Sequence, residues 1–263
     1  RRQRQMCIRD SYNTKLGQLW EDRGDLETED EMMARREDYG TRPDGSPVEL
    51  PDGVLVVTVG VDTQDDRLEY EVVGHGRWGE TWGVEKGIIM GDPAGPAVWE
   101  RLDGVTQRAY RYEDGTGLRP SLTCVDSGGH RTQQVYERCR ERWPQRVVAI
   151  KGKGGESIPY TGVPTKVPIR DKSMWTWLYT VGVDAGKATI MSSLKAREPG
   201  PRYCHFPLRR EAGYDAAFFS GLLSERLVKR PSGGLGWEKL PGHKRNEALD
   251  CRNYSLAALD ILN

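Results

Sequence analysis

The sequence predicts a mixed α/β fold, and three observations support this prediction. Residues 54–61 form a nearly continuous apolar and β-branched run, which is typical of a central strand buried on both faces. Two more strand-like segments, residues 68–75 and 81–90, follow closely and are joined by the short turn 76–79. Farther along the chain, strand-like and helix-like segments alternate. We therefore expect three antiparallel strands followed by parallel strands.

The alternating part of the chain narrows the fold class. Four segments follow in the order helix, strand, helix, strand: residues 98–105, 121–125, 132–142 and 147–150. Three sequential strands, then helix, strand, helix and strand, is the order of a ribonuclease H-like fold. This fold is a mixed sheet flanked by helices on both faces.

The remaining elements are expected in the last third of the chain. Residues 174–181 read as a strand and residues 183–194 as a helix. An exposed hairpin is expected from residues 225–230 and 235–240, around a turn that contains Pro231 and Gly234. The final helix should begin at Asn246, a residue type favoured as an N-cap, and end at Leu262.

The chain divides into two regions by composition. Residues 1–50 are polar and dense in charges of both signs, so we expect a connector with one short helix. Residues 51–263 should form the folded domain. Because the sequence begins without methionine, we expect it to be part of a longer protein.

Composition excludes few functions. The 39 basic and 39 acidic residues cancel, so any nucleic-acid-binding surface must be local. No apolar run approaches the roughly 20 residues of a membrane span, so no membrane association is expected. The five cysteines are scattered without a CxxC pair, which argues against a disulfide framework or a zinc site.

Three carboxylates stand where an α/β sheet places its chemistry. Asp62 and Asp126 each end a predicted strand, at the edge where such sheets bind ligands. Asp250 lies on the apolar stripe of the last helix, at helical spacing with Tyr254 and Ala257. A carboxylate on that stripe faces the sheet and needs a basic partner or a metal, because burial of an unpaired charge is costly.

The chemistry expected of such a cluster is two-metal phosphodiester hydrolysis. Two divalent cations about 4 Å apart need shared carboxylate oxygens, and Asp62, Asp126 and Asp250 would supply them. One ion would activate the attacking water and the other would stabilise the leaving 3′ oxygen. Glu247, one helical turn before Asp250, is a candidate fourth ligand or a base outside the metal ligands.

Several ordered blocks of the chain resemble the nuclease domain of the large terminase subunit of lambda-type tailed phages. The resemblance covers roughly residues 12–262 and is carried by these blocks: YNTKLGQLWED, VGVDTQDDRLEYEVVGHG, IIMGDP, CVDSGGH followed by VYERC, VVAIKGKGG and KRNEALDC. It implies a ribonuclease H-like fold and metal-dependent cutting of double-stranded concatemeric DNA during genome packaging. By motif, the family's acidic cluster falls on Asp62, Asp126 and Asp250.

The resemblance also implies partners and a location. The first block is similar to the segment that joins a packaging ATPase to the nuclease, so the ATPase domain is expected in the same full-length subunit. The small terminase subunit and the portal or procapsid are the other expected partners. Two Mg²⁺ or Mn²⁺ ions are the expected cofactors. The expected location is the host cytoplasm rather than the mature virion.

Basic residues near the acidic centre are candidates for binding DNA phosphates. Lys151 and Lys153 lie in the glycine-rich segment 151–155, and Lys244 and Arg245 precede the last helix. An ordinary solvated turn is the alternative interpretation of the first pair.

Residues 182–189 (GVDAGKAT) follow a predicted strand and open a predicted helix, as a phosphate-binding P-loop does. The segment departs from that motif, because three residues rather than four separate its glycines. In addition, Ala188 stands where a hydroxyl must bind Mg²⁺. We therefore predict no ATP site here.

Two other functions remain open from the sequence. A related polynucleotidyl transferase, such as an integrase or a junction resolvase, would share the fold but join strands or recognise branched DNA. A catalytically silent module would only dock DNA or the portal, and its carboxylates would be dispensable.

Overall fold

A computed structural model describes residues 27–155, 157–170, 173–229, 234–243 and 245–263. Its helices are α2 (Glu29–Ala34), α3 (Ala97–Thr106), α4 (Thr132–Glu141), α5 (Val183–Leu194), α6 (Ala216–Leu222) and α7 (Glu247–Leu262). Its first strands are β1 (Val56–Thr63), β2 (Arg67–His75), β3 (Thr81–Met90), β4 (Tyr110–Arg111), β5 (Gly117–Leu118) and β6 (Leu122–Asp126). The later strands are β7 (Val147–Lys153), β8 (Thr165–Ile169), β9 (Met174–Gly182), β10 (Cys204–His205), β11 (Glu225–Lys229) and β12 (Leu235–Lys239).

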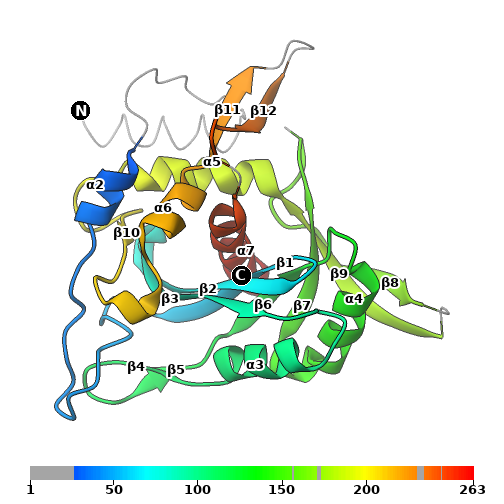
Figure 1. The fold of residues 1–263 in the computed structure, drawn as a ribbon, viewed down its shortest axis with the longest axis horizontal. Coiled ribbons are helices and arrows are strands. Elements are labelled where there is room, and N and C mark those ends of the chain that lie inside the picture. The colour runs from blue at the N-terminus through cyan, green and yellow to red at the C-terminus, as the bar shows by residue number, and fades with distance from the viewer. Residues whose placement is uncertain (1–26, 156, 171–172, 230–233, 244) are drawn as a thin grey trace.

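The described part of the chain is organised around an eight-stranded mixed sheet (Figure 1). Its strand order is β10-β3-β2-β1-β6-β7-β9-β8. Strands β1, β2 and β3 pair in antiparallel fashion, whereas β6, β7 and β9 continue from β1 as parallel strands. This is the predicted ribonuclease H-like arrangement.

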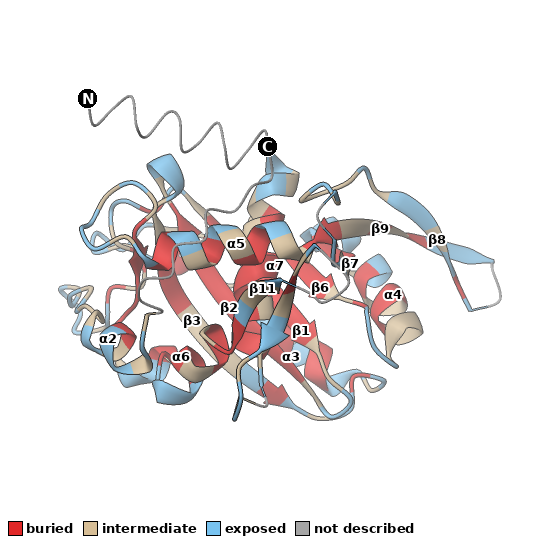
Figure 2. Ribbon diagram, turned by 90° about the horizontal axis from the view of Figure 1, so that it is seen from above, coloured by how far each residue is buried: buried red, intermediate tan, exposed pale blue. Residues whose placement is uncertain are grey.

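Helices cover both faces of the sheet, as Figure 1 shows. Helices α3 and α4 share one apolar cluster with a face of β1, β2, β3 and β7. Helix α7 lies across the other face, against β1, β2 and β6, with α5 and α6 beside it. Buried residues accordingly gather in the central strands and in α7, whereas the edge strand β8 is largely exposed (Figure 2).

Helix α7 lies unusually close to the central strand because of a glycine. A Cβ atom on Gly60 of β1 would stand 1.9 Å from the carbonyl oxygen of Cys251 and 2.5 Å from the amide nitrogen of Ser255. Only a residue without a side chain permits this approach. The close packing places the first turns of α7 next to the end of β1.

The structure differs from the sequence predictions in three details. Strand β7 extends to Lys153 by pairing with β9, so Lys151 and Lys153 belong to the strand that was predicted to end at residue 150. Asn246 precedes α7, but its side chain makes no capping hydrogen bond. The short elements β4, β5, β8, β10 and α6 were not predicted.

The described part of the expected connector packs on the domain. Residues 29–34 form α2, whose Met32 is fully buried in a cluster with α6. Val48 and Leu50 are also buried, and Leu50 belongs to the cluster beneath the sheet. Residues 1–26 lie outside the described residues. From residue 27 onward, therefore, the chain packs as part of the same body.

Within the described residues, none of the helices combines the length and apolarity needed to cross a membrane.

Candidate metal centre

The structure brings Asp62, Asp126 and Asp250 to one edge of the sheet. Asp62 lies near the end of β1 and Asp126 is the last residue of β6, and these two strands are parallel neighbours. Asp250 comes from the first turn of α7, which crosses the sheet at this point. Asp62 is 5% exposed, whereas Asp126 and Asp250 are half-buried. The three carboxylates predicted from the sequence therefore lie near one another at this edge of the sheet.

The three carboxylates are close enough to affect one another's ionisation. Burial, followed by the charge of Asp250, raises the pKa of Asp62 to about 8, although the Gln64 amide donates a hydrogen bond that opposes this shift. Burial also raises the pKa of Asp126 to about 6. The peptide N–H groups of Gly128, Ser127 and Gly152 limit that rise. Such mutual repulsion is what a bound cation would relieve.

Asp250 differs from the other two because a basic side chain is paired with it. The Lys187 ammonium lies 3.1 Å from Oδ1, and the Asn246 side-chain amide donates to Oδ2 at 2.8 Å. Burial raises the pKa of Asp250, and Lys187 acts against that rise. The basic partner expected from the sequence is thus Lys187, which no motif connected with Asp250.

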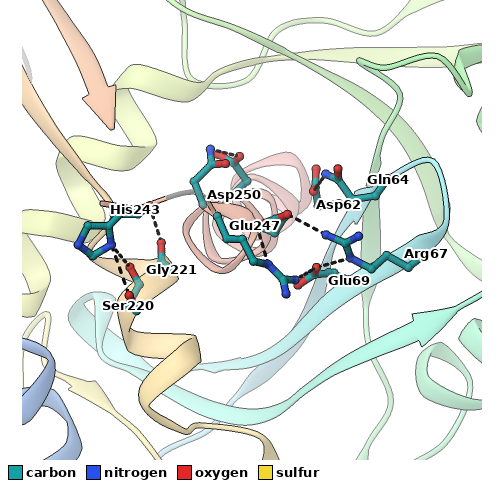
Figure 3. A network of polar contacts seen from close by, with 12 residues as sticks. Asp62, Gln64, Arg67, Glu69, Ser220, Gly221, His243, Glu247 and Asp250 are labelled. Atoms are coloured by element: carbon teal, nitrogen blue, oxygen red, sulfur yellow. Dashed lines mark hydrogen bonds and ion pairs between the residues drawn. The ribbon is translucent and has the colours of Figure 1, made fainter. Parts of the chain in front are cut away.

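Glu247 lies beside the cluster within a network of ion pairs (Figure 3). Its Oε1 accepts from Arg67 at 3.0 Å, and its Oε2 lies 3.5 Å from Arg245. Both guanidinium groups also pair with Glu69. Glu247 is 8% exposed, and its charge contributes to the raised pKa of Asp62. Two cationic partners suit it to orienting other groups rather than to binding an ion directly.

The predicted DNA-contacting residues differ in their surroundings. Lys151 and Lys153 are exposed at the end of β7, next to the strand that carries Asp126. The Gly152 peptide between them donates to Asp126, so the backbone of this segment reaches the acidic centre. Arg245 is half exposed but is already paired with Glu69 and Glu247. Lys244 lies outside the described residues.

The donor set fits divalent metal ions in its chemistry. Carboxylate oxygens are the ligands that Mg²⁺ and Mn²⁺ prefer, and Asp62 and Asp126 have no basic partner among the described residues. As the side chains stand, no three His, Cys, Asp or Glu groups among the described residues converge closely enough to hold an ion. Asp250 is the member that Lys187 and Asn246 engage.

The structure explains why residues 182–189 do not form a P-loop. Gly186 and Lys187 are buried within helix α5, which begins at Val183, so no glycine loop precedes a helix N-terminus there. A Cβ atom on Gly186 would stand 1.8 Å from Oδ1 of Asn253 on α7. This glycine therefore serves the close packing of α5 on α7, and that packing carries Lys187 to Asp250.

Fold and cluster together define a ribonuclease H-like domain with an acidic centre at the ends of its parallel strands. Comparison of the sequence with known protein families then places it more narrowly. The chain belongs to the family described as terminase large subunit gpA, endonuclease domain, whose model matches residues 2–263.

Two curated relatives agree with this assignment. The chain is 32% identical over 256 residues to the terminase large subunit of Escherichia phage lambda, and 30% identical over 258 residues to that of Enterobacteria phage P21. Each match covers 95% of this chain and 38% of the relative. The chain thus spans less than half the length of the curated relatives it matches.

Solved structures with a similar arrangement are more distant. The large terminase nuclease from thermophilic phage G20c, with bound magnesium, gives a TM-score of 0.43 at 13% identity and covers 88% of this chain and 97% of that one. The nuclease domain of the large terminase subunit gp2 of bacterial virus Sf6 gives 0.44 at 11% identity, covering 86% and 95%.

Proposed function

We propose that this domain is a divalent-metal-dependent endonuclease that cuts double-stranded concatemeric viral DNA during genome packaging. The observation that carries the proposal is the set of three acidic side chains, from β1, β6 and α7, at one sheet edge. Membership in the terminase endonuclease family supports the substrate and the setting. Burial, with a smaller contribution from neighbouring carboxylates, raises the pKa of Asp62 and Asp126, and a bound cation would favour their charged forms.

Each residue of the centre has a separate role in this proposal. Asp62, Asp126 and Asp250 would hold two Mg²⁺ or Mn²⁺ ions through their oxygens. Such ions, when bound, activate the attacking water and stabilise the leaving 3′ oxygen. Glu247 orients groups around the centre through Arg67 and Arg245. Lys151 and Lys153 hold the DNA backbone beside it.

The proposed partners follow from the family. They are double-stranded DNA, an ATPase domain in the same full-length subunit, the small terminase subunit, and the portal or procapsid. The proposed place of action is the host cytoplasm, as part of the packaging motor rather than of the mature virion. Residues 1–50 would connect the nuclease to the ATPase, with residues 27–50 packed on the nuclease itself.

Asparagine substitutions test the proposal. Asp62→Asn, Asp126→Asn and Asp250→Asn should each abolish cleavage of plasmid DNA in Mg²⁺ or Mn²⁺ while preserving the circular dichroism spectrum. Asp65→Asn is the matched control, because Asp65 lies near the same edge but is exposed. Cleavage at the wild-type rate in any one of the three variants would remove that residue from the centre.

The two alternative functions predict different results in the same assay. A strand-joining enzyme or a resolvase would favour branched over linear substrates. A silent docking module would bind DNA and cleave none of the substrates in any metal. Comparison of linear and four-way-junction DNA therefore separates all three functions.

A further inference from the structure

Lys187 reaches the acidic centre from an element that was not predicted to be part of it. It lies on α5 and is 7% exposed. The neighbouring Gly186 lets α5 approach α7 closely, because any side chain there would collide with Asn253. An ammonium group is seldom buried unless it is paired, so its partners indicate its role.

Asp250 belongs to a closed frame of polar contacts with three other side chains, those of Lys187, Asn246 and Glu225. Lys187 Nζ lies 2.8 Å from Glu225 Oε2 and 3.1 Å from Asp250 Oδ1. Asn246 Nδ2 donates to Glu225 Oε1 at 2.7 Å and to Asp250 Oδ2 at 2.8 Å. Glu225 is 7% exposed and begins strand β11. Both oxygens of Asp250 are therefore engaged by groups other than a metal.

The frame acts on Asp250 alone among the three aspartates. Lys187 forms no ion pair with Asp62 or Asp126, and the three carboxylates do not converge into an ion site among the described residues. An ammonium 3.1 Å from a carboxylate oxygen neutralises much of the charge that would attract a cation, and it repels a divalent ion at the same oxygen. The arrangement therefore stabilises the metal-free form.

We propose that Lys187 is the resident counter-ion of Asp250 and that divalent metal binding competes with it. This inference rests on the proposed function, because it assumes that Asp250 is a metal ligand. Lys187 is then a positioning residue that sets how tightly the centre binds metal. Glu225 moderates the competition, since it shares the ammonium with Asp250 and draws it away.

The proposal predicts shifts of opposite sign for the two members of the ion pair. Lys187→Met removes the competing cation, so Mn²⁺ should bind about tenfold more tightly. Glu225→Gln leaves the ammonium to Asp250 alone, so Mn²⁺ should bind several-fold more weakly. Lys187→Arg keeps the charge and should return the affinity toward that of the wild type. Lys195→Met, which removes an exposed charge just after α5, should leave the affinity unchanged.

The measurement is isothermal titration of metal-free protein with Mn²⁺, together with the melting temperature in EDTA. Lys187→Met should also lower the melting temperature of the metal-free protein. The rise in melting temperature on adding Mn²⁺ should be larger in this variant than in the wild type. A purely structural role for Lys187 would weaken metal binding in both variants or change it in neither, and either result overturns the proposal. If Lys187→Met does not fold, Glu225→Gln and Lys187→Arg still decide, because tighter or unchanged binding in Glu225→Gln contradicts the competition.

The same titration separates this inference from the proposed function. Wild-type protein that does not bind Mn²⁺, or that binds it as well after Asp126→Asn, would refute the metal centre itself. Wild-type binding that is lost in Asp126→Asn, without opposite shifts in the Lys187 and Glu225 variants, would refute only the role of Lys187.

Discussion

At the scale of single residues, Asp62 links stability to pH. Its pKa is about 8 in the fold, mainly because of burial, against 3.8 for a free side chain. Between these values the folded state binds more protons than the unfolded state, so the contribution of Asp62 to stability falls as pH rises from about 4 to about 8. The difference in unfolding free energy between Asp62→Asn and wild type should grow by a few kcal/mol across this range, in favour of the variant.

Chemical denaturation in EDTA at several pH values measures this difference. Groups outside the acidic centre titrate equally in both proteins, so the comparison isolates Asp62 and the carboxylates coupled to it. A difference that stays constant with pH would show that this carboxyl has an ordinary pKa in the fold.

Glu247 should matter less than the three aspartates. Its two oxygens are held by Arg67 and Arg245, so Glu247→Gln weakens an orienting network but removes no metal ligand. We expect kcat for plasmid cleavage to fall by about tenfold rather than to vanish. Glu100→Gln, an exposed change on α3, is the control. Complete loss of activity in Glu247→Gln would mark it as a direct ligand.

At the scale of elements, the packing of α7 on β1 holds the centre together. Gly60→Ala would place a methyl group 1.9 Å from the Cys251 carbonyl oxygen, so helix and strand must separate. We expect a loss of at least about 3 kcal/mol of unfolding free energy, measured by urea denaturation.

A second glycine provides the control for this prediction. Gly104 lies within α3 with no atom near its Cβ position, so Gly104→Ala should be neutral or stabilising by up to about 1 kcal/mol. Equal effects at both positions would mean that the close approach of α7 is not important for stability.

The sequence predicted long or strongly patterned elements well and short ones poorly. The apolar run of β1 and the helical spacing of α7 each bury a continuous face, so their patterns are clear. Strand β8 is a largely exposed edge strand that contains Pro168, and α6 has only seven residues. Neither leaves a periodic signal, because tertiary contacts rather than local pattern stabilise them.

The residues of the site also divide into those that a local sequence pattern predicts and those that only tertiary packing brings in. Asp62, Asp126 and Asp250 were predicted because each ends a strand or lies on an apolar helical stripe. Lys187 and Glu225 lie 63 and 25 residues before Asp250, and only the tertiary packing of the chain brings them to it. No pattern of residue spacing in a single sequence predicts such a contact.

At the scale of the whole molecule, DNA binding should be electrostatic and indifferent to sequence. Lys151 and Lys153 are exposed at the edge of the sheet that carries Asp126. Phosphate contacts carry no base information, and each contributes about 0.9 to the slope of log affinity against log salt. Replacing both lysines by alanine should lower that slope and weaken all duplexes equally.

Fluorescence anisotropy with several duplexes over a range of salt concentrations measures this slope. Lys195→Ala is the control for removing an exposed charge elsewhere. An unchanged slope in the double variant would place the DNA on another face. Selective loss of one duplex would instead reveal base recognition by this segment.

The dependence of cleavage on metal tests the central claim most directly. The domain, freed of metal with EDTA and dialysed, should leave supercoiled plasmid intact. Addition of Mg²⁺ or Mn²⁺ should then convert the plasmid to nicked and linear forms, and renewed EDTA should stop the reaction. Cleavage that continues in excess EDTA, or metal-restored cleavage that is undiminished in Asp126→Asn, would contradict the claim that these carboxylates form a metal-dependent nuclease centre.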